Sequence, residues 1–215
     1  MELPGGLPMA DLGEDRDGLA LDRLHVPLGP VLPDWPAGLV VRVTLQGDVI
    51  QEAAAELLDA GRAAASSWWT GRGAARELDA LARFLGVAGW ADAAAQSRRL
   101  RDALLAGASR EQIAAPAAAL ARRVRRSRTL RWLIRGIPAG ATDVAGLLEQ
   151  RLTAIEVAVA SRTETAGAVR AASRQSVDEL AGLLVGAELA AARVIVAAVD
   201  PDTEPMPVRE GARHG

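Results

Sequence analysis

Arginine is the residue type in this chain with the greatest capacity for specific contacts, and its densest group lies between positions 122 and 135. The group consists of Arg122, Arg123, Arg125, Arg126, Arg128, Arg131 and Arg135. No acidic residue occurs between Glu111 and Asp143. Because like charges at helical spacing repel one another, we expect these guanidinium groups to pair with carboxylates elsewhere. Those carboxylates belong either to this chain, for example to the acidic stretch 11–17, or to an acidic protein partner.

Two adjacent tryptophans, Trp68 and Trp69, form a second candidate contact site. They lie in an expected loop before a helix, and neighbouring side chains point in different directions, so one ring can be exposed. Exposed Trp is typical of interface hot spots. The alternative is that both rings only cover the core. The candidate interaction residues are therefore Arg122, Arg123, Arg125, Arg126, Arg131, Trp68 and Trp69.

The composition excludes most catalytic chemistry. The chain has no Cys and only two His, His25 and His214. Without Cys there are no disulfides, iron–sulfur clusters or thiol nucleophiles, and two separated His without a carboxylate cluster form no metal site. The sequence has neither a Walker motif nor a Gly-x-Ser-x-Gly elbow. We therefore expect no catalytic residue, no cofactor and no metal ligand, and we expect His25 to be a half-buried residue at the entry to a hairpin.

Charge and hydropathy also limit the partners and the location. The formal net charge is −2, and all 25 basic residues are Arg. A slightly acidic chain without Lys or Tyr is not typical of nucleic-acid binding, so we expect no nucleic-acid partner; an anionic lipid surface stays an alternative. The most apolar stretch, 180–199, contains Glu188 and Arg193, which favours a buried helix over a transmembrane segment. The N-terminus has no signal-peptide pattern, and we expect a cytoplasmic protein.

Proline and glycine divide the chain into three parts. Residues 1–38 are rich in both, which predicts an extended N-terminal arm without regular structure. Residues 39–200 predict a single helical domain that begins with a β-hairpin, and residues 201–215 predict a flexible tail. The expected fold class is mainly α with a small N-terminal β-hairpin, an α+β fold with a helical bundle core.

The hairpin is predicted from two signals. Apolar residues alternate over 39–45, as in a strand with one buried face, and Gly47-Asp48 is a turn sequence. The following segment fits two structures, a returning strand over 49–54 or an Ala-rich helix over 48–59 that starts with a capping box. We favour the strand.

Helices are predicted for most of the remaining chain. Apolar spacing and terminal glycines predict helices over 74–85 and 91–105. A capping box at Ser109 and Gln112 begins a third segment, which Pro116 is expected to restart as a first-turn proline and which then continues as one basic helix to Arg135. Two further helices are expected, one capped by Thr142 and running to 159, the other capped by Ser176 and running to 199.

Three segments of the sequence carry a family resemblance. They are Gly29-Pro30-Val31-Leu32-Pro33 with Ala37-Gly38, the helix 77–85 with Gly89 and Asp92, and the basic segment 127–137. Together they resemble the quinone-proximal large subunit of respiratory complex I and the related large subunits of nickel–iron hydrogenases. The first segment is similar to the entry of that family's N-terminal hairpin.

The resemblance implies a scaffold without the redox chemistry of the family. Leu32 and Ala37 occupy the positions of two family histidines, Phe84 stands at or beside a third, and the chain has no Tyr and no nickel-binding Cys. A reduced relative of this kind is expected to be a non-catalytic structural or accessory subunit of a complex I/hydrogenase-like redox complex. It would act by protein–protein docking, peripheral to the inner membrane through its partners. The alternative is a stand-alone helical enzyme or ligand-binding domain with a carboxylate/Arg site that the sequence does not locate.

The composition generates a direct prediction about metal content. Because the chain has no Cys and two separated His, the purified protein should contain no tightly bound transition metal. Elemental analysis after a chelator wash should therefore find nickel, iron and zinc far below one equivalent per chain. Near-stoichiometric metal would contradict this prediction.

Overall fold

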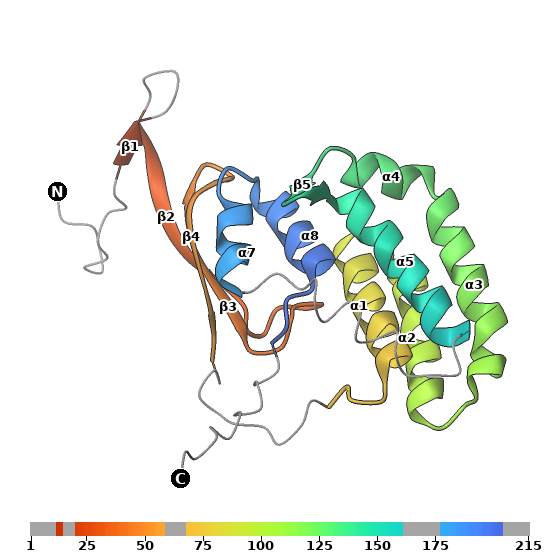
Figure 1. Cartoon of the computed structure of the whole chain (residues 1–215). Coiled ribbons are helices and arrows are strands. Elements are labelled where there is room, and N and C mark those ends of the chain that lie inside the picture. The colour runs from red at the N-terminus through yellow and green to blue at the C-terminus, as the bar shows by residue number, and fades with distance from the viewer. Residues whose placement is uncertain (1–11, 15–19, 59–67, 161–176, 204–215) are drawn as a thin grey trace, which may run out of the picture.

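The computed structural model describes residues 12–14, 20–58, 68–160 and 177–203. The strands are β1 (Leu12–Glu14), β2 (Ala20–Leu28), β3 (Leu39–Gln46), β4 (Val49–Leu57), β5 (Pro138–Ala139) and β6 (Thr142–Asp143). The helices are α1 (Gly73–Val87), α2 (Ala91–Leu105), α3 (Arg110–Arg126), α4 (Arg128–Ile134), α5 (Val144–Ala160), α7 (Val177–Leu184) and α8 (Leu189–Val199). Within the described residues this is a mainly helical α+β fold with an N-terminal antiparallel sheet, as the sequence predicts (Figure 1).

The hairpin of β3 and β4 is present, and the strand alternative for the segment after Gly47 is confirmed. The two strands pair in antiparallel register, with Val43 opposite Ala53. Val41, Val43 and Leu45 are buried on the face that points into the core. Alanine-rich sequence favours a helix locally, but pairing with a strongly apolar neighbour strand outweighs that preference here.

The expectation of no regular structure over 1–38 is wrong for part of that region. Strand β2 pairs with β3, and its first residues also pair with β1 to form a second hairpin that extends from the body in Figure 1. Pro27 lies opposite Arg42, where β2 is the outer strand of the sheet. Proline is tolerated at a sheet edge because the missing N–H faces away from the ladder, so its presence did not exclude a strand.

The loop between β2 and β3 is fixed by a buried tryptophan. The Trp35 Nε1–H donates a hydrogen bond to the carbonyl oxygen of Leu39 at 2.8 Å. Gly29 adopts a positive φ of 86° beside this contact, and a Cβ at Gly29 would lie 2.3 Å from the Leu39 oxygen and 2.4 Å from Trp35 Nε1. Glycine is therefore required at position 29 for two reasons, its backbone conformation and the space that the indole occupies.

The helices form a bundle that two C-terminal helices connect to the sheet. Helix α1 packs against α2 and α5, and α3 packs against α2 and α5. Helix α7 packs on β4, while α8 packs against α1 and α5, so both lie between the sheet and the bundle in Figure 1. Three backbone hydrogen bonds make the link at the sheet: Ile50 N to the Ala187 oxygen at 2.9 Å, Gly186 N to the Ile50 oxygen at 2.8 Å, and Leu189 N to the Asp48 oxygen at 2.8 Å. The core is made of small aliphatic side chains around Phe84 and Leu78.

The third helix differs from the expectation at two points. Pro116 lies inside α3 and does not restart it. The residue is exposed, so the carbonyl that loses its helical partner faces the solvent side of the helix. The basic segment is not one helix to Arg135, because α3 ends at Arg126 and α4 begins at Arg128. Ser127 lies between them with an extended backbone, and its hydroxyl oxygen accepts a hydrogen bond from Leu130 N at 3.2 Å.

The C-terminal helices also differ in their boundaries. Asp143, and not Thr142, caps α5, because its carboxylate accepts a hydrogen bond from Gly146 N at 2.8 Å. The expected last helix is two helices, α7 and α8, separated at Gly186, whose φ is 82°. Ser176, the expected cap of this segment, lies outside the described residues. Among the residues that the structure describes, no helix is long and apolar enough to cross a membrane.

The close approach at Gly29 predicts a large effect of a small substitution. Gly29→Ala should destabilise the fold by about 1–3 kcal/mol through overpacking, in addition to about 1–2 kcal/mol for a Cβ in the left-handed region. Gly38→Ala is the matched control, because Gly38 has a φ of 74° and a Cβ at that position would have no atom within 4 Å. Urea unfolding of both variants measures the difference, and equal losses would show that the Trp35 contact does not limit position 29.

Candidate interaction surface

A buried arginine stands at the centre of the first charged cluster. The Arg151 side chain, on α5, is 1% exposed. Its Nη1 lies 3.4 Å from Asp200 Oδ2 and 3.9 Å from Glu77 Oε2, and its Nη2 donates to the carbonyl oxygen of Ala198 at 2.9 Å. These contacts join α5, α1 and the end of α8. A buried guanidinium is tolerated only when its charge and its donors are satisfied, and these three groups supply that compensation.

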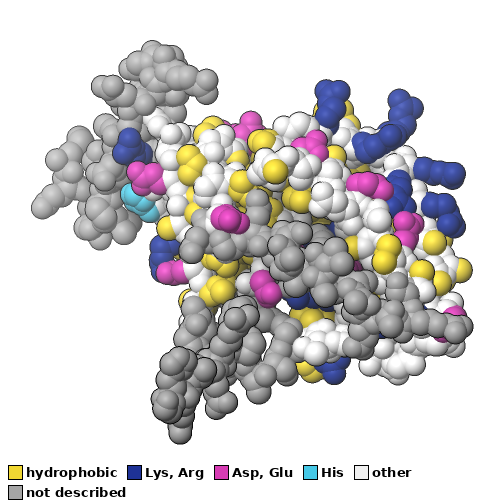
Figure 2. All heavy atoms as spheres, viewed as in Figure 1, with side chains coloured by type: hydrophobic (Ala, Val, Ile, Leu, Met, Phe, Trp, Pro, Cys, Tyr) yellow, Lys and Arg dark blue, Asp and Glu magenta, His cyan; other side chains and the backbone are white. Residues whose placement is uncertain are grey.

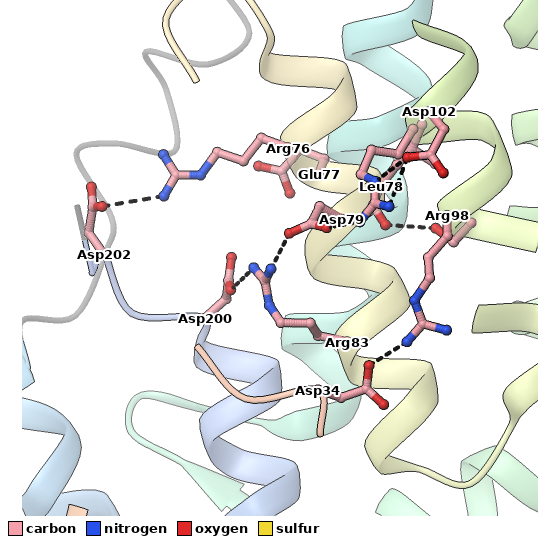
Figure 3. Close-up of polar contacts among 12 residues, drawn as sticks. Asp34, Arg76, Glu77, Leu78, Asp79, Arg83, Arg98, Asp102, Asp200 and Asp202 are labelled. Atoms are coloured by element: carbon pink, nitrogen blue, oxygen red, sulfur yellow. Dashed lines mark hydrogen bonds and ion pairs between the residues drawn. The ribbon is translucent and has the colours of Figure 1, made fainter. Parts of the chain in front are cut away.

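The cluster continues along α1 and α2 as alternating charges (Figure 3). Arg83 Nη2 donates to Asp200 Oδ1 at 2.6 Å, and Arg83 also pairs with Asp79. Asp79 in turn pairs with Arg101 of α2. A separate pair joins Arg98 of α2 to Asp34 of the loop between β2 and β3, so that the loop, both helices and the C-terminal segment are connected.

Asp200 has the strongest electrostatic perturbation in this cluster. Burial by itself would raise the pKa of this carboxyl, but the positive charges of Arg151 and Arg83 outweigh it and lower the pKa to about 2. The residue ends α8 with a φ of 52°, a left-handed conformation that Asp and Asn adopt more readily than most residues. Asp200 therefore remains ionised at neutral pH and holds two arginines.

The alternative function, an enzyme or a ligand-binding domain, requires a site built from carboxylates and arginines. This cluster contains both types of group, but they are directed at one another. Each carboxylate of Asp79 and Asp200 contacts two guanidinium groups. A catalytic or binding site needs at least one such group directed at a ligand. We therefore assign the cluster a structural role, which is to fix α1, α2, α5 and the C-terminal segment relative to one another.

Some arginines of the basic segment 122–135 pair with carboxylates of the described residues, and others do not. Arg125 lies against α5, where it hydrogen-bonds Glu149 at 2.8 Å and both oxygens of Glu156 at 2.8 and 3.0 Å. Arg123 donates to Asp92 at 2.6 Å. Arg123 and Arg125 thus pair with carboxylates of this chain. Those carboxylates belong to α2 and α5, and not to the stretch 11–17. The stretch 11–17, which we considered as a partner, lies almost entirely outside the described residues.

The remaining arginines of the segment are exposed. Among the described residues, no carboxylate pairs with Arg122, Arg126, Arg128, Arg131 or Arg135. Basic side chains accordingly gather at one end of the molecule in Figure 2, above α3 and α4. The carboxylates of the described residues therefore relieve the expected repulsion among like charges for only part of the group.

Helix α4 combines these charges with a large exposed ring. Its buried residues are Leu130 and Ile134, and at about 100° per residue Trp132 lies on the opposite side. Arg128 and Arg131 are on one flank of Trp132, and Leu133 is on the other. Trp132 is 73% exposed and Leu133 is 43% exposed. We call Arg128, Arg131, Trp132, Leu133 and Arg135 the α4 surface. Sequence reasoning missed Trp132 as a site residue, although its helical spacing from Leu130 and Ile134 carried the signal.

The two predicted tryptophans are not part of this surface. Trp68 is 61% exposed, and its ring is covered on one face by Arg72, whose Cζ lies 4.0 Å from the ring centroid. Trp69 is half-buried. Residues 68–72 lead into α1 at the bottom of Figure 1, whereas α4 is at the top. The structure therefore places Trp68 and Trp69 at the other end of the bundle from Arg131.

His25 is exposed on the outer face of the sheet, and not half-buried as expected. Its Nδ1 lies 3.1 Å from Thr44 Oγ1, and the Thr44 hydroxyl donates to Glu52 Oε2 at 3.3 Å. These side chains come from three adjacent strands and form a short polar ladder. Within the described residues, no group of three or more His, Cys, Asp or Glu could hold a metal ion.

Comparison with protein-family models, curated protein sequences and solved structures gave no match for this chain.

The pKa of Asp200 generates a pH prediction with a defined sign. The pKa of Asp200 is about 2 in the folded protein, against 3.8 for an unperturbed Asp side chain. The ionised carboxylate therefore stabilises the native state at pH values above 4. This stabilisation of about 2 kcal/mol, at about 1.4 kcal/mol per pKa unit, is lost as the pH falls from 4 to 2. Asp200→Asn should therefore lower the free energy of unfolding by about 3–5 kcal/mol near neutral pH, and the gap to the wild type should narrow in acid.

The control for this measurement is Asp202→Asn. The Asp202 side chain is 41% exposed and lies 3.5 Å from Arg76, so its removal should change stability by about 1 kcal/mol or less. Denaturant unfolding of the three proteins between pH 7 and 2.5 tests the assignment. A gap between wild type and Asp200→Asn that does not change with pH would contradict it.

Proposed function

We propose that this protein is a non-catalytic accessory subunit of a complex I/hydrogenase-like redox complex, and that it docks an acidic protein through the α4 surface. The observation that carries the docking is the combination of Arg128, Arg131 and Arg135 with the exposed Trp132. In this proposal the protein acts on the cytoplasmic side and reaches the inner membrane only through its partners.

The composition of the α4 surface favours a protein partner. Arg and Trp are the residues most enriched at interface hot spots, and the strongest hot spots are central rings surrounded by polar side chains. Trp132 is an exposed ring with arginines near it in the sequence, since Arg128 and Arg131 precede it on α4 and Arg135 follows the helix. Three guanidinium groups that pair with no carboxylate of the described residues also favour a negatively charged partner, since complementary charge increases the association rate and selects the partner.

The rigidity of α4 supports the same conclusion. Leu130 and Ile134 are buried under the helix, and the Ser127 cap fixes its first turn. The backbone of the surface is therefore ordered before binding, which reduces the entropy lost on association.

The assignment to a redox complex rests on the sequence resemblance. Two of the three similar segments lie near one another, because a Cβ at Gly86, directly after the helix 77–85, would meet the carboxylate of Asp34, directly after the segment 29–33. The third contains the α4 surface. Leu32 is partly buried against the core and Phe84 is buried within it, so apolar packing occupies two of the positions where the family has histidine.

Charge reversal on α4 tests the docking. Arg131→Glu/Arg135→Glu should weaken binding of the partner by about tenfold or more, equivalent to about 1.4 kcal/mol, because two attractive contacts become repulsive. The measurement is capture from the native host with tagged full-length protein at low salt and at 1 M salt, where the Debye length is about 3 Å. We expect subunits of an iron–sulfur or quinone-reducing complex, identified by mass spectrometry, with the wild type at low salt only.

The matched control is Arg23→Glu/Arg99→Glu, which makes the same change in net charge at exposed positions of β2 and α2. This control should retain the partner. If the α4 variant captures the same proteins as the wild type, the α4 surface is not the docking site. If the wild type captures no subunit of a redox complex, the assignment to such a complex is wrong.

A further inference from the structure

A shallow, open hollow on the side of α3 combines arginine side chains with a tryptophan ring. It has a volume of about 490 Å³ and is lined by Trp90, Ala119, Arg122, Arg123, Arg126 and Ser127. The hollow belongs to α3 and the start of α2, and it shares none of the residues of the α4 surface.

One wall of the hollow is held in place before any ligand binds. Arg123 donates to Asp92 at 2.6 Å and to Gln96 at 3.3 Å, and its Cζ lies 5.1 Å from the centroid of the Trp90 ring. The charge of Arg123 is thus partly compensated by Asp92. Its side chain covers one face of the Trp90 ring.

The other two arginines lack this compensation. Arg122 and Arg126 are one helical turn apart and exposed, and no carboxylate of the described residues pairs with either. Like charges at this spacing destabilise a helix by a few tenths of a kcal/mol, and an anion between them would remove the repulsion. Two guanidinium groups fit the oxygens of a phosphate monoester, which carries about two negative charges near neutral pH and accepts paired N–H donors.

We propose that this hollow binds a nucleoside phosphate, with the phosphate on Arg122 and Arg126 and the planar base against Trp90 and Ala119. The ring assignment rests on Trp90, which is half-buried and lines the hollow together with Ala119, because aromatic side chains stack on nucleic-acid bases. A carboxylate would neutralise only one of the two arginines. The proposal goes beyond the docking function and does not depend on it.

Calorimetric titration of the full-length protein tests the site. The ligands are the four common nucleoside monophosphates and diphosphates, inorganic phosphate, adenosine, and a short single-stranded RNA. We expect at least one nucleotide to bind more tightly than inorganic phosphate by about tenfold or more, with no measurable binding of adenosine and no gain in affinity for the RNA.

Paired variants locate the binding. Arg122→Gln/Arg126→Gln should weaken nucleotide binding by about tenfold or more, whereas Arg128→Gln/Arg131→Gln, with the same change in net charge on α4, should leave it nearly unchanged. All four positions are exposed, and circular dichroism should show equal helix content in both variants.

Three results would overturn the proposal. If no nucleotide binds with a Kd below about 1 mM, or if both variant pairs weaken binding equally, there is no specific site at the hollow. If inorganic phosphate binds as tightly as the nucleotides, Trp90 takes no part in recognition. If the RNA binds more tightly than every nucleotide, the ligand of the hollow is a nucleic acid and not a nucleoside phosphate.

Discussion

The buried contact between Arg151 and Asp200 is the constraint on which the assembly of this fold depends. Arg151 is fully buried in a core of Ala, Leu and Val, where an unpaired guanidinium would be strongly unfavourable. Its compensation comes from Asp200, Glu77 and the Ala198 oxygen, which lie on elements far from it in sequence. Helix α5 can therefore be buried in its present position only when α1 and the end of α8 are in place.

The same contact explains the order of the neighbouring charges. Asp200 also holds Arg83, which pairs with Asp79, and Asp79 pairs with Arg101. Ion pairs of this type give little net stability compared with apolar packing, and their best-supported role is to select one arrangement over others. In a core built from small aliphatic side chains, which fit together in many ways, such selection compensates for the lack of large side chains with distinctive shapes.

The outer arginines are separated from this internal group by the break at Ser127. Within α3, Arg123 and Arg125 turn toward α2 and α5 and find carboxylates there. After Ser127 the chain changes direction, so that α4 buries Leu130 and Ile134 and presents Arg128, Arg131 and Trp132 outward. In a single helix continuing to Arg135, the side chains of α4 would follow the same helical axis and the same buried face as those of α3. The break gives α4 its own outward face, on which the proposed docking depends.

Local sequence patterns determined which elements this protein has. Alternation over 39–45 with the Gly47 turn, and apolar spacing with caps and terminal glycines for the helices, act within a few residues and identified the hairpin and α1, α2 and α5. Tertiary structure decided what depends on distant partners. These include β2, which is a strand because β3 pairs with it despite Pro27; the end of α3 at Ser127; and the division of the arginines into paired and exposed groups. The physical reason is that a strand edge, a buried charge or a free guanidinium is defined by what lies opposite it in space, and one-dimensional spacing contains no record of that partner.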